Sequence, residues 1–316
     1  MKAAVVRAFD QPPRYETFSP PPDAPGTPVD VLAAALSPRV RSGASGRHYT
    51  ARGMLPLVPG LDGVGRLPDG RRVYFLAADD RLGTMAEQTR ADPRLTVALP
   101  AEVSAPVVAA AMLPAISSWV ALTKRVALQP GQRVLVLGAT GTAGQLAVQI
   151  ARLLGAGPVV AAGRNPKALE RLRELGASEI VPLGKADSDA GAVAAAASEV
   201  DIVLDYLWGP VTAAVMPAIC RRRQDESRPL DWVLIGSVTG DEIALSSVLL
   251  RQRNLRILGS GQGAVGTADM FSVSQDVVGA LAAGRLQIGV RAVPLADVER
   301  QWTTAPPSGE RLVFVP

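Results

Sequence analysis

One histidine stands in the whole chain of 316 residues, within the stretch ASGRHYT at positions 44–50. Histidine is the side chain most often used for proton transfer near neutral pH, and tyrosine can also serve as a catalytic acid. His48 is therefore a candidate catalytic base, a candidate metal ligand, or a bystander in a loop. Its neighbour Tyr49 is a second candidate proton donor. In an extended loop only one of these two side chains would point inward.

A zinc site is not expected, because His48 lacks partner ligands. A catalytic zinc takes about three protein ligands and a structural zinc takes four, whereas the chain offers one histidine and one cysteine, Cys220. A single cysteine also excludes an intrachain disulfide. Cys220 stands in MPAICRRR, near the end of a helical segment, and we expect a packed thiol there and not a nucleophile.

A glycine-rich turn carries the clearest chemical signal. In RVLVLGATGTAGQLAVQIARLLGA, residues 133–156, an apolar strand ends at Gly138 and a helix opens after the turn. The spacing Ala139-x-Gly141-x-x-Gly144 is a variant of the dinucleotide-binding fingerprint. Gly141 would let the backbone approach a pyrophosphate, and Gly144 would let the helix pack closely on the strand. The helix amino terminus would offer N–H groups to the phosphates.

The end of the following strand indicates which dinucleotide binds. Enzymes that use NAD place Asp or Glu there to bind the ribose 2′-hydroxyl, but this chain reads AAGRNPKALE, residues 161–170, with no carboxylate at that position. Arg164 and Lys167 suit the 2′-phosphate of NADP(H). Cations at a helix amino terminus oppose its dipole, so a bound anion explains them better than helix decoration does.

The turn belongs to a regular series of strands and helices after residue 117. Apolar strand-like runs occupy 133–138, 158–163, 179–183, 201–207, 231–237 and 256–260, and helical segments occupy 143–155, 166–176, 189–199 and 210–222. Continuous apolar strands that alternate with amphipathic helices form parallel sheets covered on both faces. The sequence therefore predicts an α/β fold with a doubly wound six-stranded parallel sheet of the Rossmann type.

The rest of the chain has a different character. Before residue 117, short runs such as KAAVV, VDVLAAAL and RRVYFLA alternate with turns rich in proline and glycine, which predicts a β-rich domain. We expect a β-rich substrate and catalytic domain over 1–117 and a cofactor domain over 118–259. A helix over about 268–283 and a strand, short helix and strand after it would return residues 260–316 to the first domain.

The composition limits which classes of partner and which cellular location we expect for the protein. The net charge of +4 comes with only 4% aromatic residues and no basic stripe, so no nucleic acid is expected. We expect no membrane span, because we see no run of about 18 apolar residues. The start, MKAAVVRAF, is typical of a strand and not of a secretory signal. The expected location is the cytoplasm.

These segments resemble the medium-chain dehydrogenase/reductase superfamily over essentially the whole chain. The resemblance rests on PLVPGLDGVG (56–65), GTMAEQT (83–89), LPAISSWVAL (113–122), the cofactor segment 128–156, LIGSVTG (234–240), RILGSGQG (256–263) and the ending from 292. It implies that the β-rich domain is GroES-like and that LPAISSWVAL is the helix joining the two domains.

Departures from the superfamily's zinc enzymes point to one branch. Those enzymes carry a Gly-His-Glu motif where this chain has Gly60-Leu61-Asp62, a catalytic cysteine near the present Ser37, and a four-cysteine lobe that is missing here. The chain therefore resembles the zinc-independent branch of quinone oxidoreductases and enoyl reductases. That branch implies NADPH, a homodimer and reduction of an activated double bond. Its usual Asn in the substrate pocket is replaced by Ser37, and a Tyr that often helps bind the 2′-phosphate is replaced by Leu183.

The resemblance and the motifs together predict the site. Candidate catalytic residues are Tyr49, His48 and Ser37, and candidate substrate-binding residues are Arg41, Asp62, Trp119 and Gln262. Trp119 could instead serve helix packing, and Asp62 could cap a turn. The expected cofactor residues are Ser117, Thr140, Gly141, Thr142, Ala143, Gly144, Gly163, Arg164, Asn165, Lys167, Leu207, Gly236, Ser237 and Ser260.

Three functions are compatible with these residues. The first is an NADPH-dependent, zinc-independent reductase of activated C=C bonds or quinones. The second is a metal-free alcohol or carbonyl oxidoreductase. The third is a protein that binds NADPH without catalysis.

Overall fold

The computed structural model describes residues 1–51, 54–184, 186–304 and 309–316, and it divides into two compact units. Unit 1 comprises Met1–Leu113, Ser274–Gly284 and Ile288–Pro316, and unit 2 comprises Pro114–Val273 and Arg285–Gln287. The sequence-based division placed the second boundary at 259. The chain instead stays with unit 2 through Val273, because the loop and helix after the last parallel strand belong to that unit.

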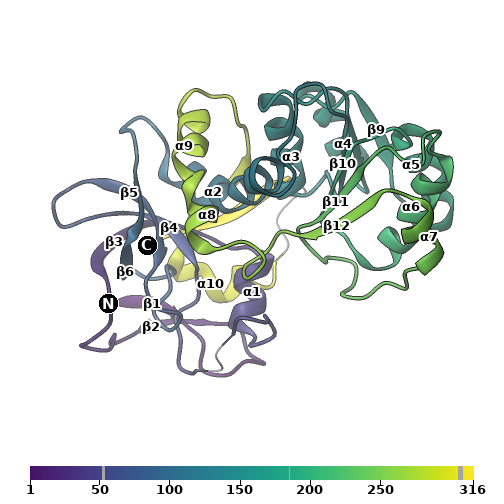
Figure 1. Ribbon diagram of the computed structural model, residues 1–316. Coiled ribbons are helices and arrows are strands. Elements are labelled where there is room, and N and C mark those ends of the chain that lie inside the picture. Colours follow the sequence, from purple (N-terminus) through teal and green to yellow (C-terminus); the bar gives the residue numbers. More distant parts are fainter. Residues whose placement is uncertain (52–53, 185, 305–308) are drawn as a thin grey trace. The chain divides into compact units, whose positions relative to one another are not determined.

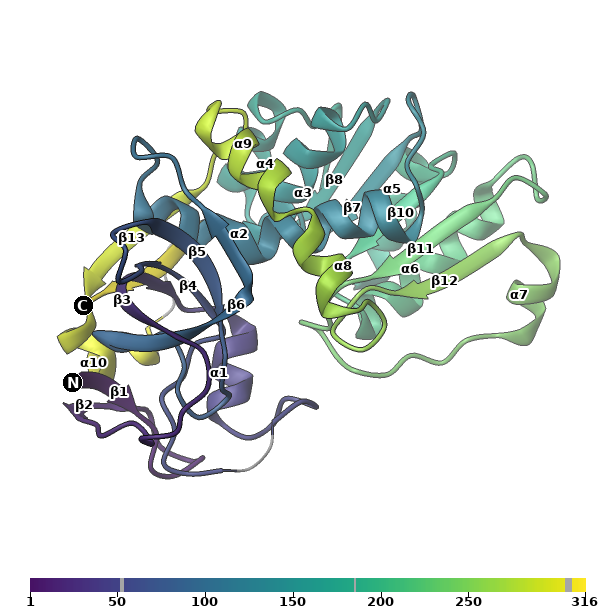
Figure 2. The ribbon, with the colours of Figure 1, turned by 60° about the vertical axis from the view of Figure 1, so that its left-hand side comes forward.

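Unit 2 is built on a parallel sheet of six strands, as the sequence predicted (Figures 1 and 2). Its order is β12-β11-β10-β7-β8-β9, which is the Rossmann order. The bounds are β7 (Val134–Leu137), β8 (Val159–Gly163), β9 (Glu179–Pro182), β10 (Ile202–Asp205), β11 (Leu230–Leu234) and β12 (Leu255–Gly259). Each strand falls within one of the predicted apolar runs, except that β11 and β12 each begin one residue earlier.

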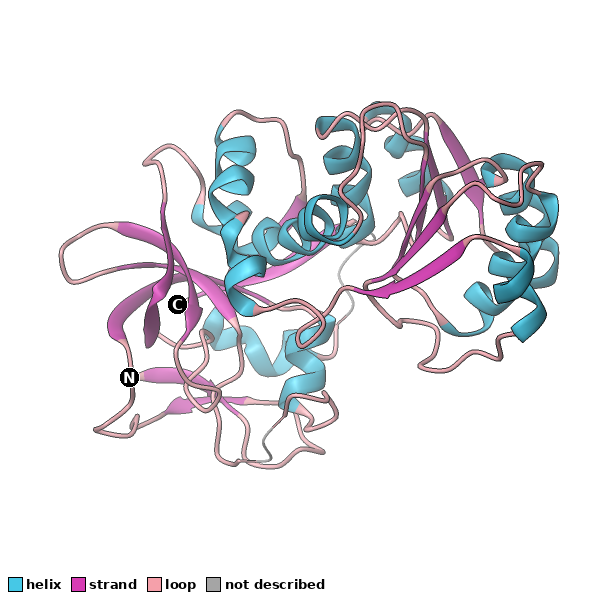
Figure 3. Ribbon diagram, viewed as in Figure 1, coloured by secondary structure: helices cyan, strands magenta, loops and turns pink. Residues whose placement is uncertain are grey.

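Helices cover both faces of this sheet. The helix α3 (Thr142–Leu153) lies on one face, and α5 (Ala186–Ala197) and α6 (Gly209–Arg222) lie on the other (labelled in Figure 1 and seen from the same side in Figure 3). The core on the α5 and α6 side joins Leu135, Val160 and Val203 of the strands to Val193 and Met216 of the helices. Cys220 is fully buried in this core, as expected. The remaining helices of the unit are α4 (Pro166–Glu174), α7 (Ser247–Gln252) and α8 (Thr267–Ser272).

Unit 1 is rich in strands, and four of them close on themselves. Its large sheet has the order β13-β14-β3-β4-β5-β6, and β3 also pairs with β6, which makes β3–β6 barrel-like. The bounds are β3 (Thr27–Ala35), β4 (Asp62–Arg66), β5 (Arg72–Ala77), β6 (Gln88–Ala98), β13 (Gly289–Pro294) and β14 (Glu310–Val315). A separate antiparallel pair joins β1 (Lys2–Val5) and β2 (Arg14–Thr17).

The helices of unit 1 include one that the sequence did not predict. Ser37 accepts a hydrogen bond from the Val40 amide and Pro38 occupies the first turn, so α1 (Pro38–Ala44) begins directly after β3. The predicted helix over 268–283 is two helices, α8 and α9 (Ser274–Ala282), separated at Val273. The unit also holds η2 (Leu295–Asp297) and α10 (Val298–Trp302).

The helix α2 (Ala105–Val120) spans the boundary between the units, and the π-helical turn η1 (Ala121–Arg125) continues it. We expected no segment that could span a membrane, but Ala105–Arg125 is long and apolar enough by composition. Its most apolar window is 72% buried. Burial inside the protein explains this apolar composition as that of a core helix.

Candidate functional site

The predicted cofactor residues gather at one edge of the sheet in unit 2. The parallel register places Leu137 level with Ala162 and Asp205, and Leu234 level with Asp205 and Gly259. The segments that follow these residues therefore start at the same carboxyl edge, where open α/β sheets bind their ligands. Thirteen of the fourteen predicted residues lie in those segments, and Ser117 lies in α2.

Two glycines of the fingerprint are required for different reasons. A β-carbon on Gly144 would stand 2.6 Å from the Cα of Ala139 and closer still to the Gly138 carbonyl, so α3 can pack on the turn only with glycine there. At Gly141 the nearest atom would be 3.5 Å away, and φ is −74°. The fold itself therefore makes no demand for glycine at Gly141. Its missing side chain leaves space at the amino terminus of α3, where Gly141, as the N-cap residue, has no side chain to cap the helix, as a pyrophosphate needs.

Asp205, which sequence reasoning missed, fixes the neighbouring turn. Its buried carboxylate accepts hydrogen bonds from the Leu207 and Trp208 amides at 2.8 and 3.0 Å. It also accepts from the Thr212 hydroxyl at 2.6 Å and the Trp232 indole at 2.8 Å. These bonds hold Trp208 at a φ of 53°, which is unusual for a residue other than glycine. In the sequence, this role of Asp205 was indicated by an acidic residue at the end of the apolar run DIVLD.

The end of β8 presents positive charge. A β-carbon on Gly163 would stand 2.5 Å from Cγ2 of Thr140, so these two predicted residues lie side by side. The Asn165 side chain accepts from the Ala168 amide at 3.1 Å and thus caps α4. Arg164 and Lys167 are exposed, and within the described ranges neither side chain forms a hydrogen bond or ion pair. Both are available to an anion.

The remaining residues of this edge differ in burial. The Ser260 hydroxyl is buried and has no hydrogen-bond partner in the part of the chain that the structure describes. Ser237 is exposed and donates to Asp241 at 2.7 Å. In α2, the Ser117 hydroxyl donates to the Pro114 carbonyl at 2.8 Å. An orphaned buried hydroxyl, uncapped N–H groups and unpaired cations at one edge fit a bound dinucleotide phosphate group.

In unit 1 the predicted catalytic stretch is a turn and not an extended loop. The Ala51 amide donates to the His48 carbonyl at 2.8 Å, so Tyr49 lies at the centre of a tight turn. The expectation that His48 and Tyr49 point in opposite directions is therefore wrong. Their rings stack with centroids 4.3 Å apart, and Tyr49 is 72% exposed.

Hydrogen bonds within the turn involve Nδ1 of the His48 ring. Nδ1 lies 2.9 Å from the Thr50 hydroxyl and accepts from the Thr50 amide at 3.2 Å. Arg39 of α1 donates to the same hydroxyl at 2.6 Å. Partial burial, and then the nearby Arg39 guanidinium, lower the pKa of His48 from 6.5 to about 4. His48 is therefore neutral near pH 7 and is not an imidazolium acid there.

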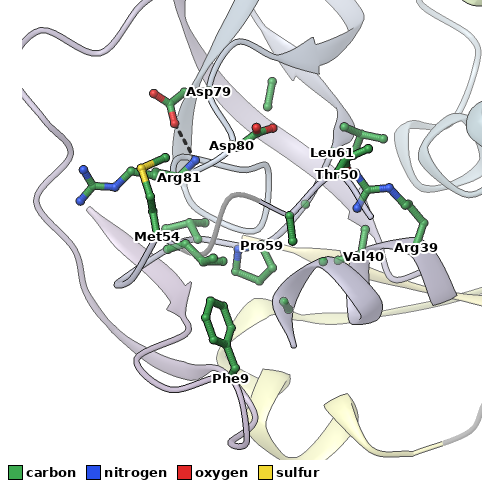
Figure 4. A pocket seen from close by; sticks show the side chains of 17 residues that line it. Phe9, Arg39, Val40, Thr50, Met54, Pro59, Leu61, Asp79, Asp80 and Arg81 are labelled. Atoms are coloured by element: carbon green, nitrogen blue, oxygen red, sulfur yellow. Dashed lines mark hydrogen bonds between the residues drawn. The ribbon is translucent and has the colours of Figure 1, made fainter. Parts of the chain in front are cut away.

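A pocket of about 80 Å³ lies beside α1 in the same unit (Figure 4). Arg39 and Thr50 form part of its wall, together with Leu61 and Asp80. Leu61 directly precedes Asp62, a predicted substrate residue, but Asp62 itself is not among the residues that line the pocket. Arg39 was not among the predicted residues, because nothing in its sequence neighbourhood distinguished it from Arg41.

The other predicted residues, Ser37 among them, are described within the unit to which each belongs. Asp62 is buried in β4 and does not cap a turn; the Tyr74 hydroxyl donates to it at 3.1 Å, and burial raises its pKa to about 6. Ser37 caps α1, and Arg41 donates to the Thr304 carbonyl at 3.1 Å. In unit 2, Trp119 is buried and Gln262 is half-buried.

The residues do not fit a catalytic zinc ion. No group of three His, Cys, Asp or Glu side chains close enough to hold a metal occurs among the described residues. Leu61 stands at the position of the zinc-binding histidine of the resembling enzymes and has no ligand atom. Cys220 belongs to α6, and its side chain is buried in the core of unit 2.

Comparison with known proteins gives consistent matches. Residues 143–277 match the family model described as zinc-binding dehydrogenase. The chain is 28% identical over its whole length, and the whole of that protein's length, to "Probable NADPH-dependent quinone reductase tdiC" of Emericella nidulans. It is 30% identical to "NADPH-dependent alkenal/one oxidoreductase, chloroplastic" of Arabidopsis thaliana, over 47% of this chain and 42% of that one.

A solved structure of similar sequence covers the whole chain. The quinone oxidoreductase from Thermus thermophilus is 25% identical, with a TM-score of 0.82 and complete coverage of both chains. A family match over part of unit 2 could reflect a shared cofactor fold alone. Here the barrel-like unit, the parallel sheet and their order along the chain are shared as well. Together these matches support the medium-chain dehydrogenase/reductase superfamily, in its quinone oxidoreductase-like branch, as the family that this chain resembles.

Proposed function

We propose that the protein is an NADPH-dependent, zinc-independent oxidoreductase that reduces an activated C=C bond or a quinone. The observation that carries this proposal is the pair of exposed, unpaired cations Arg164 and Lys167 at the carboxyl edge of the sheet. They stand where enzymes that use NAD place a carboxylate. The names of the relatives, which include an NADPH-dependent quinone reductase and an alkenal/one oxidoreductase, support the same function.

The proposed NADP(H) site uses the carboxyl edge of unit 2. Gly141, Thr142 and Ala143 at the start of α3 would hold the pyrophosphate, and Arg164 with Lys167 would hold the 2′-phosphate. The Ser260 hydroxyl, buried without a partner in the described residues, would gain one from the cofactor. When bound, NADPH supplies a hydride.

The protein's own contribution to the reaction is electrostatic. Negative charge develops on the carbonyl oxygen of an enone or quinone when its conjugated carbon is reduced, and hydrogen-bond donors that stabilise this charge lower the barrier. We assign this role to the segment of His48 and Tyr49. Because the pKa of His48 is about 4, the proton that completes the product comes from the Tyr49 hydroxyl or from water. A catalytic role of Ser37 and contacts of the substrate with Arg41, Asp62, Trp119 and Gln262 remain predictions.

A substrate panel tests this function. NADPH consumption is measured with quinones, enones, aldehydes and ketones. Turnover with quinones or enones alone is expected. Turnover with aldehydes or ketones would instead identify a metal-free alcohol or carbonyl oxidoreductase. Tight NADPH binding without turnover on any of them would identify a binding protein without catalysis.

The replacement of Tyr49 by Phe separates two roles of that residue. If the hydroxyl donates the proton or stabilises the oxygen, kcat falls by roughly 10²-fold. If the ring only shapes the site, KM changes and kcat does not. Because Tyr49 is 72% exposed, the fold should tolerate the change, which unfolding curves would confirm.

The proposal includes a homodimer without metal, located in the cytoplasm. In the described part of the chain β12 pairs only with β11, so the other edge of β12 is open. Open strand edges are templates for pairing with a second chain. Val248 and Leu250 of the preceding α7 are 45% exposed each, and such apolar exposure beside an open edge favours a two-fold contact. Elemental analysis should find no stoichiometric zinc.

A further inference from the structure

A chain of hydrogen bonds connects Arg39 to the only histidine. The Arg39 guanidinium donates to the Thr50 hydroxyl oxygen at 2.6 Å. That oxygen lies 2.9 Å from Nδ1 of His48, and the Thr50 amide donates to the same nitrogen at 3.2 Å. All three residues belong to unit 1, in α1 and in the turn that follows it.

The direction of each bond in this chain follows from which groups can donate. A guanidinium has donors only, so the Thr50 oxygen must accept from Arg39. The Thr50 hydroxyl could still donate to Nδ1 or accept from it, because its oxygen has two lone pairs. The Thr50 backbone amide can only donate, so Nδ1 accepts from it, and the hydroxyl must then also donate to Nδ1. A ring nitrogen that accepts carries no proton, and the ring proton of neutral His48 must therefore reside on Nε2.

We propose that Arg39 and Thr50 are positioning residues that hold His48 as the neutral tautomer with its proton on Nε2, and that this N–H stabilises the substrate oxygen without giving up its proton. The catalytic half of this inference rests on the proposed function. The tautomer half does not, because it follows from the hydrogen bonds alone.

The charged groups around the ring support a neutral histidine. Arg39 approaches from α1, and a second positive charge on His48 would repel it and would break the bond that the Thr50 amide donates to Nδ1. Asp80, from the loop after β5, faces Arg39 and acts on the guanidinium charge. Arg47 precedes His48 but is bonded through Nε to the Ser45 hydroxyl at 3.1 Å and is exposed. Tyr49 stacks on the ring, with the two ring centroids 4.3 Å apart.

The assigned role balances with NADPH as the reductant. Bound NADPH would supply the hydride by loss of a C–H bond and would leave as NADP⁺, so that a C–H bond would form at the conjugated carbon, the C=C electron pair would move toward the carbonyl, and the carbonyl oxygen would take the negative charge. Nε2–H donates a hydrogen bond to that oxygen and keeps its proton, because the neutral imidazole is too weak an acid to release it. The proton that completes the product comes from the Tyr49 hydroxyl or from water. A fixed donor of this kind needs no reorganisation when the charge appears.

The single histidine allows a direct test by nuclear magnetic resonance. Protein labelled with ¹⁵N-histidine, freed of any affinity tag, gives the two ring-nitrogen signals of His48 alone. Long-range proton–nitrogen spectra recorded from pH 3.5 to 8 report the tautomer and the pKa together. Four proteins are compared: the wild type, Arg39→Met, Thr50→Val and Arg47→Met as the control with the same loss of charge.

The wild type should show one unprotonated nitrogen at Nδ1 and a protonated Nε2 throughout the neutral range. Arg39→Met should raise the pKa of His48 by about one unit or more, as expected for the loss of an adjacent cation. Thr50→Val should raise it as well and populate the second tautomer. Arg47→Met should change neither. A wild-type proton on Nδ1, titration near the ordinary value of 6.5, or equal effects of Arg39→Met and Arg47→Met would overturn the proposal. If Arg39→Met does not fold, the spectra of the wild type and Thr50→Val still test the tautomer of His48.

Kinetics test the catalytic half separately, with whichever substrate the panel identifies. The wild-type kcat/KM should show no limb from histidine between about pH 5.5 and 8, and Thr50→Val should gain one near its new His48 pKa. The same limb in both proteins contradicts the catalytic role. Absence of turnover on the whole panel contradicts the proposed function and leaves the tautomer assignment to the resonance data.

Discussion

Gly144 approaches the turn before α3 so closely that a β-carbon there would stand 2.6 Å from the Cα of Ala139, whereas a β-carbon on Gly141 would meet nothing nearer than 3.5 Å. The two glycines should therefore respond differently to alanine. Gly144→Ala should destabilise the fold by about 1–3 kcal/mol, as overpacking does. Gly141→Ala should cost within about 1 kcal/mol but should weaken NADPH binding at least tenfold, because its methyl group would occupy the space of the pyrophosphate.

Urea unfolding and NADPH titration of both variants provide the measurement, and each variant is the control for the other. The assignment of Gly141 to the ligand would be wrong if Gly141→Ala bound NADPH normally. It would also be wrong if both variants lost stability and affinity in the same proportion.

Selectivity for NADPH over NADH should depend on Arg164. Its exposed guanidinium has no partner in the described residues, and a hydrogen bond to a charged phosphate contributes about 1.5–3 kcal/mol. Arg164→Ala should therefore weaken NADPH binding by roughly 10- to 150-fold and leave NADH binding unchanged. Arg171→Ala removes an exposed charge from the same helix, α4, and should change neither affinity. Equal dissociation constants for both cofactors in the wild type would contradict the assignment.

The proposed dimer can be tested at α7 without disturbing the core. Val248→Asp with Leu250→Asp places two charges on side chains that are 45% exposed each. Light scattering of the wild type should give twice the chain mass of 32.9 kDa, and the double variant should give the chain mass itself. The urea midpoint of the double variant controls for misfolding. A monomeric wild type at micromolar concentration would refute the dimer.

Much of unit 2 could be predicted from sequence because its signals are local. The strands are continuous apolar runs, and β7, β8 and β10 are buried along their whole length, as parallel strands between two helical layers must be. The fingerprint glycines also stand at fixed spacing. By contrast, α1 lies in SPRVRSGA, whose Pro, Ser and Gly content predicts a loop. Its helix depends on the Ser37 cap and on packing of Val40, which sequence periodicity over seven residues cannot reveal.

The parts of the site that were missed depend on distant partners. Asp205 bonds to Trp232, which is 27 positions further along the chain, and the neighbouring sheet strand supplies that contact. The hydrogen bond of Arg39 depends on the turn at 48–51, which places the Thr50 hydroxyl beside α1. The wrong expectation that the His48 and Tyr49 side chains point in opposite directions has a similar cause. The hydrogen bond from the Ala51 amide to the His48 carbonyl forms a turn, and in this turn the two rings stack.

The stability of the protein should depend on pH through Asp62. Burial is the largest cause that raises its pKa from 3.8 to about 6, against the Tyr74 hydrogen bond and the charge of Arg311, which lower it. For a carboxyl whose pKa is raised on folding, the folded state binds the proton more tightly than the unfolded state does. Its contribution to stability is fully present below about pH 3.8, and it is lost as the pH rises through about 6. A pKa difference of this size between the folded and unfolded states corresponds to about 3 kcal/mol.

Asp62→Asn removes this titration and keeps the size of the side chain. The free energy of unfolding, measured in urea from pH 4.5 to 8, should fall less steeply with pH in Asp62→Asn than in the wild type, with the difference concentrated between about pH 4.5 and 7. Only the slopes are compared, because the amide replaces a carboxyl group that accepts a hydrogen bond from the buried Tyr74 and can therefore shift the stability at every pH. Asp69→Asn, at an exposed turn carboxylate paired with Arg71, should keep the wild-type slope. Parallel curves for the wild type and Asp62→Asn would mean that Asp62 ionises in the fold as easily as in the unfolded chain, and that β4 is more hydrated than its burial indicates.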